Sequence, residues 1–189
     1  DDFLSDSNRP PDDPPEVRVT LPKATTSDED ALVCVADTGR GMSLERLSQA
    51  LRAGYSGKAR YGSLGLFGMG FNIATARLGY VTEVRTTQAG DPDWLVVEIS
   101  LRDLQNLNTF KVPVRRVPKD NPMLHGTEVT VRRLRPGIRD ALKRPSTVAS
   151  IREQLGNVYS YLLRSESPVP ELPDTALAGR GFRLYVNGT

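Results

Sequence analysis

The residues best suited to chemistry form a short block, Asp37-Thr38-Gly39-Arg40-Gly41. Asp37 ends a run of apolar residues, and a carboxylate at a strand end can accept a hydrogen bond from an exocyclic amine such as N6 of adenine. Gly39 and Gly41 carry no side chains, so a flat base can approach the backbone, and Met42 offers a soft apolar contact. A tight turn after a strand produces the same pattern, so this block alone leaves both interpretations open.

A second block of glycines precedes a segment with helical patterning. Unhindered amides at the start of a helix bind anions and the helix dipole strengthens the site, so a triphosphate fits there. Residues 54–58 lack the spacing of a GxxxxGK phosphate loop, and the glycine order does not match a dinucleotide fingerprint. A plain flexible loop is the alternative, but it does not explain why a helix begins with so many poor helix formers. The block consists of Gly65, Leu66, Phe67, Gly68, Met69, Gly70 and Phe71.

A third block, Gly126-Thr127, opens a stretch rich in β-branched residues. A hydroxyl from Thr127 can support the carboxylate of Asp37 or hold a water beside it. A β-branched residue placed there only for its strand propensity is the competing interpretation. We interpret His125, which comes just before this block, as a turn residue rather than as a base or a metal ligand.

The composition of the 189 residues is that of an ordinary globular chain, with 38% hydrophobic and 25% charged residues. The length suits one domain, or one domain with the start of another. Cys34 is the single cysteine, which excludes an internal disulfide and a cysteine metal cluster, and we expect it to be a core residue. No apolar run is long enough to span a membrane and no signal core is visible, so we expect a cytoplasmic protein.

The charge is uneven along the chain, although its net value is only +2. Residues 1–50 carry 5 basic and 11 acidic side chains, whereas residues 51–189 carry 20 basic and 12 acidic ones. We interpret the basic excess as a solvated surface. A nucleic-acid-binding face is the alternative, but neither a recognition helix nor interleaved aromatic residues support it.

Most of the chain has strand-like patterning. Residues 31–36 form a continuous apolar run, which predicts a buried strand that delivers Asp37 at its end. Other segments alternate apolar and polar residues or lie between turn-like glycine, proline and asparagine clusters. Strands are predicted at 16–21, 31–36, 81–87, 94–101, 109–117, 127–133 and 181–186.

Three helices are expected between these strands. Ser43 is placed to cap a helix over residues 44–51. A second helix starts near Met69 and is expected to end with Gly79 as a C′ residue. A stripe at helical spacing predicts a third helix over 148–163. The stripe consists of Val148, Ile151, Leu155, Val158 and Leu162.

Taken together and in this order, the three blocks resemble the motifs of the GHKL ATPases. This superfamily includes DNA gyrase B subunits, heat-shock chaperones of the ninety-kilodalton class, histidine kinases and MutL-type mismatch-repair proteins. Asp37 to Gly41 resembles the DxGxG motif, residues 65–70 the GxxGxG motif and Gly126-Thr127 the late Gly-Thr pair. Residues 56–71 are most similar to the chaperone and MORC-type branches, and the resemblance spans residues 31–133.

The resemblance implies a Bergerat-type fold: an α/β (α+β) two-layer sandwich in which a mixed, mainly antiparallel sheet carries helices on one face. ATP would lie between the helices and the sheet, with Asp37 on the adenine amine and Thr127 assisting. Residues 54–70 would form the ATP lid around the phosphates. Lys58 in this lid could contact the γ-phosphate, or it could be a solvated surface lysine.

The resemblance also implies a first motif on a helix before the DxGxG strand. That helix supplies a glutamate that activates water and an asparagine that holds Mg²⁺. Only its tail is expected here, with Asp2 at the asparagine position, where a carboxylate could still ligate the metal. The glutamate is expected upstream of Asp1, so the chain is either trimmed or a binder without the general base for hydrolysis.

We therefore expect a GHKL-type ATP-binding domain over residues 1–163, with a flexible loop at 5–15. Residues 164–180 are expected to connect it to a second, transducer-like domain that starts at 181–189. The chain is interpreted as the nucleotide-binding module of a larger protein. Its expected partners are an adenine nucleotide, further domains of the same polypeptide and a second copy in a nucleotide-dependent homodimer.

The favoured function is an ATPase module that hydrolyses ATP to drive lid closure and a conformational change in the larger protein. A module that senses nucleotide without turnover is the alternative. A histidine-kinase ATP domain and a DNA-associated ATPase are weaker alternatives. The first lacks a phosphoacceptor-histidine helix, and the second rests on the basic excess and on the MORC and mismatch-repair relatives.

Overall fold

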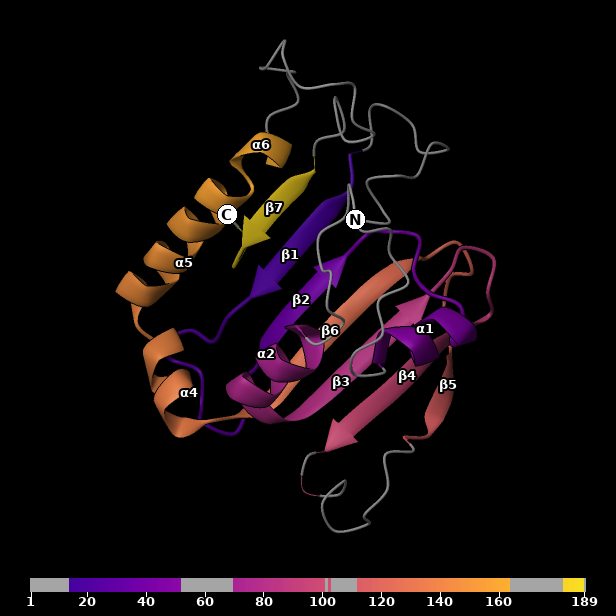
Figure 1. Ribbon diagram of the computed structural model, residues 1–189, viewed down its shortest axis with the longest axis horizontal. Coiled ribbons are helices and arrows are strands. Elements are labelled where there is room, and N and C mark those ends of the chain that lie inside the picture. The colour runs from indigo at the N-terminus through magenta and orange to yellow at the C-terminus, as the bar shows by residue number, and fades with distance from the viewer. Residues whose placement is uncertain (1–13, 52–69, 101, 103–111, 164–181, 189) are drawn as a thin grey trace.

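A seven-stranded sheet runs through the computed structural model, which describes residues 14–51, 70–100, 102, 112–163 and 182–188 (Figure 1). The strand order is β5-β4-β3-β6-β2-β1-β7, and every neighbouring pair is antiparallel except β1 and β7, which run parallel. The expected mixed, mainly antiparallel sheet is confirmed. The strands are β1 Glu16–Thr20, β2 Val33–Asp37, β3 Gly79–Thr87, β4 Asp93–Ser100, β5 Val114–Pro118, β6 Gly126–Leu134 and β7 Arg183–Val186.

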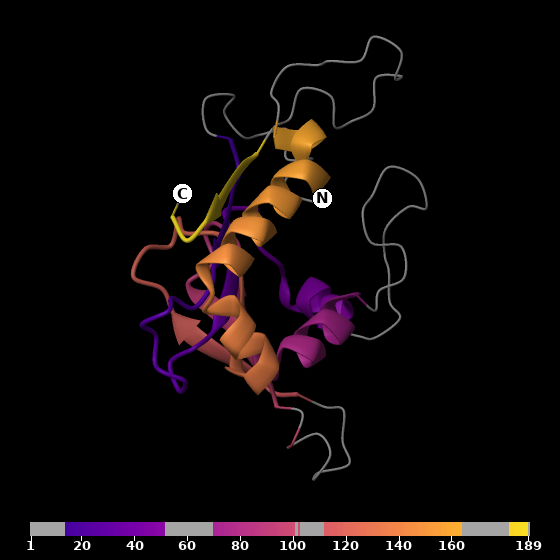
Figure 2. The same ribbon diagram turned by 90° about the vertical axis from the view of Figure 1, so that its left-hand side faces the viewer.

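The described helices lie on one face of the sheet, in two groups (Figure 2). One group, α1 and α2, packs mainly on β3 and β4, although Leu78 at the end of α2 reaches the hydrophobic cluster under the second group. The second group, which includes α4 and α5, packs on the side of β1, β2 and β7. This arrangement confirms the expected two-layer α/β sandwich. The helices are α1 Leu44–Leu51, α2 Gly70–Leu78, α4 Pro136–Leu142, α5 Pro145–Val158 and α6 Ser160–Leu163.

Two hydrophobic clusters join the helices to the sheet, one under each group. Side chains alternate between the two faces of a strand, so each strand gives every second residue to the helix side. β6 contributes to both clusters, through Val131 on one side and Val129 on the other, so the boundary between the clusters crosses β6. The α1–α2 cluster consists of Leu47, Val84, Leu95 and Val97, and the α5 cluster consists of Leu21, Ala31, Val33, Val131, Leu134, Leu142 and Val186.

Ser43 caps α1, as the sequence predicts. Its Oγ accepts a hydrogen bond from the Arg46 amide at 3.3 Å, and its carbonyl oxygen accepts one from the Leu47 amide at 2.9 Å. With the helix started in this way, Leu47 faces the sheet and is fully buried, while Leu44 faces outward and is exposed. The cap therefore sets which face of α1 enters the core.

α2 ends at Leu78, directly before Gly79, as the sequence predicts, but Gly79 does not close the helix as a C′ cap. Gly79 does not have a positive φ and is the first residue of β3. A side chain at this position would meet the carbonyl oxygen of Arg132 at 2.7 Å and a methyl group of Val131 at 2.8 Å. Glycine is required because β3 starts in close contact with β6.

The helical region after β6 differs from the single helix predicted over 148–163. α4 comes first and begins at Pro136, in a Pro-Gly pair that normally marks a turn. α5 then runs from Pro145 to Val158, and its C-cap Tyr159, with a φ of −101° and a ψ of 10°, separates it from α6. Val158 is 73% exposed, so it does not belong to the buried stripe. The stripe residues that pack against the α5 cluster are Val148, Ile151 and Leu155.

β7 belongs to the same sheet as the other strands. It pairs with β1, and its residue Val186 is buried in the α5 cluster. That a second domain starts at 181–189 stays a prediction.

Cys34 lies on the face of the sheet opposite the helices, in register with Thr130 of β6. It is only half-buried, so the expectation that it is a core residue is wrong. Burial raises the pKa of its thiol, against a smaller lowering by the hydrogen bond with Thr130. The thiol therefore stays protonated at neutral pH, which fits an unreactive cysteine.

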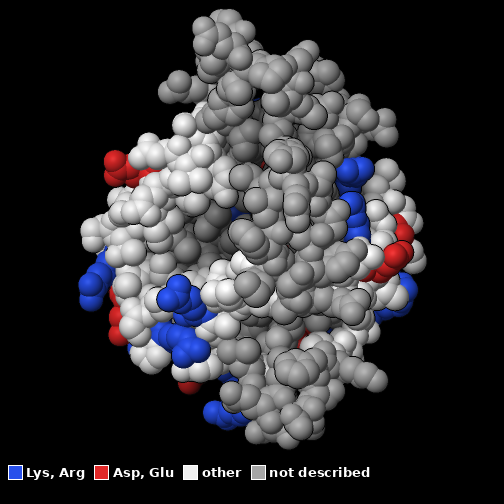
Figure 3. All heavy atoms as spheres, viewed as in Figure 1, with Lys and Arg blue, Asp and Glu red and all other residues white. Residues whose placement is uncertain are grey.

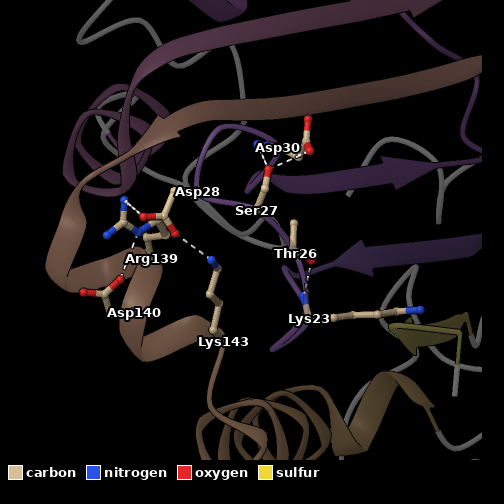
Figure 4. Close-up of polar contacts among 8 residues, drawn as sticks. All are labelled: Lys23, Thr26, Ser27, Asp28, Asp30, Arg139, Asp140 and Lys143. Carbon is tan, nitrogen blue, oxygen red and sulfur yellow. Dashed lines mark hydrogen bonds and ion pairs between the residues drawn. The ribbon is translucent and has the colours of Figure 1, made fainter.

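The connection between β1 and β2 is tied to α4 by a charged group (Figure 4). The Asp28 carboxylate forms an ion pair with Arg139 at 2.8 Å and accepts a hydrogen bond from Lys143 at 2.7 Å, and Arg139 also contacts Asp140 at 2.9 Å. The hydrogen bond from Lys143 lowers the pKa of Asp28, so this carboxylate is charged at neutral pH. Exposed ion pairs add little stability individually, so we regard this group as fixing the position of the connection on α4.

We expect Leu47→Ala to lower the free energy of unfolding by roughly 2–5 kcal/mol, because it leaves a cavity at a fully buried position. Val158→Ala is the control, since its side chain is 73% exposed and its loss should change stability by no more than about 0.5 kcal/mol. Chemical denaturation followed by circular dichroism measures both. Small and equal effects in the two variants would contradict the core position of Leu47.

Candidate functional site

Asp37 is the last residue of β2, and its register partner is Thr127 in β6. Its Oδ1 accepts a hydrogen bond from the Gly39 amide at 2.7 Å. Burial raises the pKa of the Asp37 carboxyl above its usual value, although backbone hydrogen bonds from Gly39 and Thr127 act in the opposite direction. The structure thus brings the first and third sequence blocks side by side around a partly desolvated carboxylate.

Val35, two residues before Asp37 on the same face of β2, is 39% exposed. Its neighbour on that face, Val33, belongs to the α5 cluster, and its register partner Val129 packs against the α1–α2 cluster. Val35 therefore lies where the two clusters meet. The expectation of a buried strand over 31–36 is wrong at this residue, because the two helix groups leave the sheet between them uncovered. As a result, the exposed apolar side chain of Val35 lies next to the carboxylate of Asp37.

The loop after Asp37 is held by the ends of two strands. The Thr38 amide donates to the Glu16 carbonyl oxygen at 3.0 Å, and the Glu16 amide donates back to Thr38 Oγ1 at 3.0 Å. At the other end of the loop, the Met42 amide donates to Thr86 Oγ1 at 2.9 Å. The path of the loop is therefore fixed by β1 on one side and β3 on the other.

His125 holds the middle of the same loop. Its Nδ1 lies 2.7 Å from the carbonyl oxygen of Gly39. A carbonyl oxygen can only accept, so Nδ1 carries the proton and donates it. The interpretation of His125 as a turn residue omitted this contact, because nothing near it in the sequence indicates a partner so distant along the chain.

Gly41 and Gly126 mark two close approaches of backbone, with φ of +71° and +132°. A side chain on Gly41 would overlap the Thr87 carbonyl oxygen, and one on Gly126 would overlap the Asp37 carbonyl oxygen. Any other residue would push the loop away from β3, or β6 away from β2. Backbone packing therefore explains both glycines, in addition to the ligand access that the sequence suggests for Gly41.

Thr86 lies at the centre of these contacts and is missing from the residues that the sequence singles out. It is fully buried, and its Oγ1 contacts the Gly126 carbonyl oxygen at 3.1 Å and Thr127 Oγ1 at 3.0 Å. The available signal was a pair of threonines, Thr86 and Thr87, at the end of a predicted strand. Hydroxyls buried there must find partners, which points to a polar network.

Of the other residues predicted for the site, three are described by the structure and the rest are not. Met42 and Phe71 pack against the α1–α2 cluster, so they connect the site to the core. Gly70 is the first residue of α2, and a side chain there would meet nothing within 4 Å. Lys58, residues 65–69 and Asp2 lie outside the described residues. The phosphate-binding part of the site therefore stays a prediction.

Neither a metal centre nor a membrane span is found in the described segments. No group of three or more histidine, cysteine, aspartate or glutamate side chains there could hold a metal ion. The expected Mg²⁺ ligand, Asp2, lies outside these segments, so the metal site stays a prediction. No helix in them combines the length and the apolar character needed to cross a membrane.

Residues 13–122 match the family described as histidine kinase-, DNA gyrase B-, and HSP90-like ATPases. The chain belongs to this family. The GHKL assignment is thereby confirmed, and the chain is an ATP-binding module of GHKL ATPase type, whereas its place in the chaperone or MORC branch stays a prediction. No curated protein is similar enough to the chain to count as a relative.

The family match includes the first two sequence blocks but ends before Gly126-Thr127. The sheet connects the third block to the first, because the register of β2 and β6 places Thr127 directly opposite Asp37. The candidate site therefore combines a carboxylate from within the matched residues with a hydroxyl from beyond them.

A separate hollow of about 310 Å³ lies between the β1–β2 connection, α5 and the end of β7. Its lining includes three cationic side chains, those of Lys23, Lys143 and Arg152. Two of them have partners within the protein: Lys143 donates a hydrogen bond to Asp28, and Arg152 donates one to the Val186 carbonyl oxygen at 3.3 Å. None of the lining residues belongs to the loop over 37–42 or to β6, so this hollow is distinct from the candidate site around Asp37.

Basic and acidic side chains are interspersed over the described part of the surface in Figure 3. The face opposite the helices also pairs its charges. There Arg132 contacts Glu83 at 3.3 Å and Glu98 at 3.9 Å. Local pairing of this kind fits the interpretation of the basic excess as a solvated surface.

We expect Asp37→Asn to be at least as stable as the wild type at pH 7, because the amide oxygen can still accept from Gly39 while a buried charge is removed. The raised pKa of Asp37 stabilises the fold below the ordinary Asp pKa, and that contribution is lost as the pH rises through the folded-state pKa. The advantage of the variant should thus be larger at pH 7 than at pH 4. Thermal unfolding at both pH values measures it, and a variant that melts below the wild type at pH 7 would contradict the burial of a charged Asp37.

Proposed function

We propose that this GHKL module binds ATP with the adenine ring on Val35 and the 6-amino group against Asp37. The observation that carries the proposal is an exposed apolar residue and a partly buried acceptor, two positions apart on one strand face, at the boundary of the two clusters. Covering Val35 with a ring removes apolar surface from water, and an amine hydrogen bond to a carboxylate is charge-assisted. Thr127 assists from the opposite strand.

The phosphates extend from this position toward the start of α2. Residues 54–70 wrap them as a lid, with backbone amides of the block from Gly65 to Phe71 and the side chain of Lys58 as contacts. The start of a helix favours such anions. Asp2 is the residue of this chain that would hold Mg²⁺, through oxygen ligation.

ATP hydrolysis then drives lid closure and a conformational change in the larger protein, through further domains of the same polypeptide and a nucleotide-dependent homodimer. Sensing of nucleotide without turnover is the alternative. Release of inorganic phosphate from ATP by the full-length protein separates the two, since a sensor binds ATP but releases none.

We expect the wild type to bind ATP and Asp37→Asn to bind it roughly 10- to 100-fold more weakly, because the variant presents an amide group where a charged acceptor is needed. Asp140→Asn is the matched control: it removes one carboxylate from an exposed pair with Arg139, away from β2. Calorimetric titration of ATP and ADP with Mg²⁺ measures all three proteins. Equal affinity in the wild type and Asp37→Asn would overturn the role of Asp37.

A further inference from the structure

Thr86 Oγ1 has three polar neighbours and a single hydrogen. The neighbours are the Met42 amide at 2.9 Å, the Gly126 carbonyl oxygen at 3.1 Å and Thr127 Oγ1 at 3.0 Å. The side chain is fully buried, so water cannot substitute for any of them. The direction of each hydrogen bond follows from what each neighbour is able to do.

Only one arrangement satisfies all three contacts. The Met42 amide can only donate, so it occupies one lone pair of Thr86 Oγ1. The Gly126 carbonyl oxygen can only accept, so it takes the hydrogen of Thr86. Thr127 Oγ1 must then donate its own hydrogen to the remaining lone pair of Thr86. The hydroxyl of Thr127 consequently has no hydrogen left for the cleft and presents lone pairs alone.

We infer that Thr86 determines purine specificity by fixing Thr127 as a hydrogen-bond acceptor. Thr127 is in register with Asp37, whose carboxylate is also an acceptor, so the two strands present a pair of acceptors side by side. A 6-amino purine offers two hydrogens to such a pair, directly or through a water. A 6-oxo purine places a carbonyl oxygen there and meets only lone pairs. Thr86 touches no ligand and acts through Thr127.

This inference rests on the proposed function, because it assumes that the purine lies at Asp37. Unlike that proposal, it requires the buried hydroxyl of Thr86 to affect which base is bound. Without the Thr86 hydroxyl, the hydrogen of Thr127 becomes free to turn toward the cleft and donate to a carbonyl oxygen. Removing Thr86 should therefore change the preference between two bases, and not merely weaken binding of both.

The test compares ATP with inosine triphosphate, which has a carbonyl oxygen where ATP has the 6-amino group. We expect the wild type to prefer ATP, and Thr86→Val, which keeps the shape but loses the hydroxyl, to reduce the ratio of the two affinities roughly tenfold. Thr86→Ser, which keeps the hydroxyl, should have the affinity ratio of the wild type. Thr82→Val is the matched control, since Thr82 is also buried on the same face of β3, four residues away along the strand. The ratio of this variant should equal that of the wild type.

A second variant keeps the inference testable if Thr86→Val does not fold. Thr127→Val removes the acceptor itself and should lower the ratio to the same degree. The variant that combines Thr86→Val with Thr127→Val, where it folds, should have the same affinity ratio as either single variant, because both changes act on the hydroxyl of Thr127. An unchanged ratio in Thr127→Val, or an equal loss of both nucleotides in Thr86→Val, would overturn the inference. Absence of binding by the wild type to either nucleotide would instead refute the proposed function.

Discussion

The site depends on two points at which backbone presses against backbone. Gly41 lies against the end of β3 at Thr87, and Gly126 lies against the end of β2 at Asp37. Both contacts exclude a side chain, and together they hold three chain segments at one corner of the sheet. The hydrogen bonds of this corner form only because these segments are that close. The loop over residues 37–42 is therefore shaped by the sheet rather than by its own turn propensity.

The division of the helices into two groups lowers the stability of the fold but leaves an apolar surface that a ligand can cover. A single continuous helix layer would cover Val35 and bury more apolar surface, which would stabilise the fold. The structure instead leaves Val35 exposed and keeps Asp37 partly desolvated beside it. Both features are unfavourable in the free protein and favourable once a flat, amine-bearing ligand covers them. Binding sites commonly retain such local destabilisation, because a ligand can relieve it.

Local chemistry made part of this structure predictable. The Ser43 cap, the strand periodicity and the Asp37 and Thr127 blocks depend on neighbours in sequence, and the fold class followed from the order of the blocks. Val35, Thr86 and His125 could not be placed in this way. The exposure of Val35 depends on where two helix groups stop, and the contacts of Thr86 and His125 depend on strand register. Gly79 shows the same limit, since its close contact with β6 is invisible from the helix that precedes it.

The central claim is that adenine lies on Val35 beside Asp37. Nuclear magnetic resonance of isotope-labelled valine methyl groups during an ATP titration tests it most directly. Val148, which lines the separate basic hollow, is the internal reference. The account predicts that the methyl signals of Val35 shift strongly because an aromatic ring covers them, while those of Val148 stay in place. Shifts at Val148 with none at Val35 would contradict it.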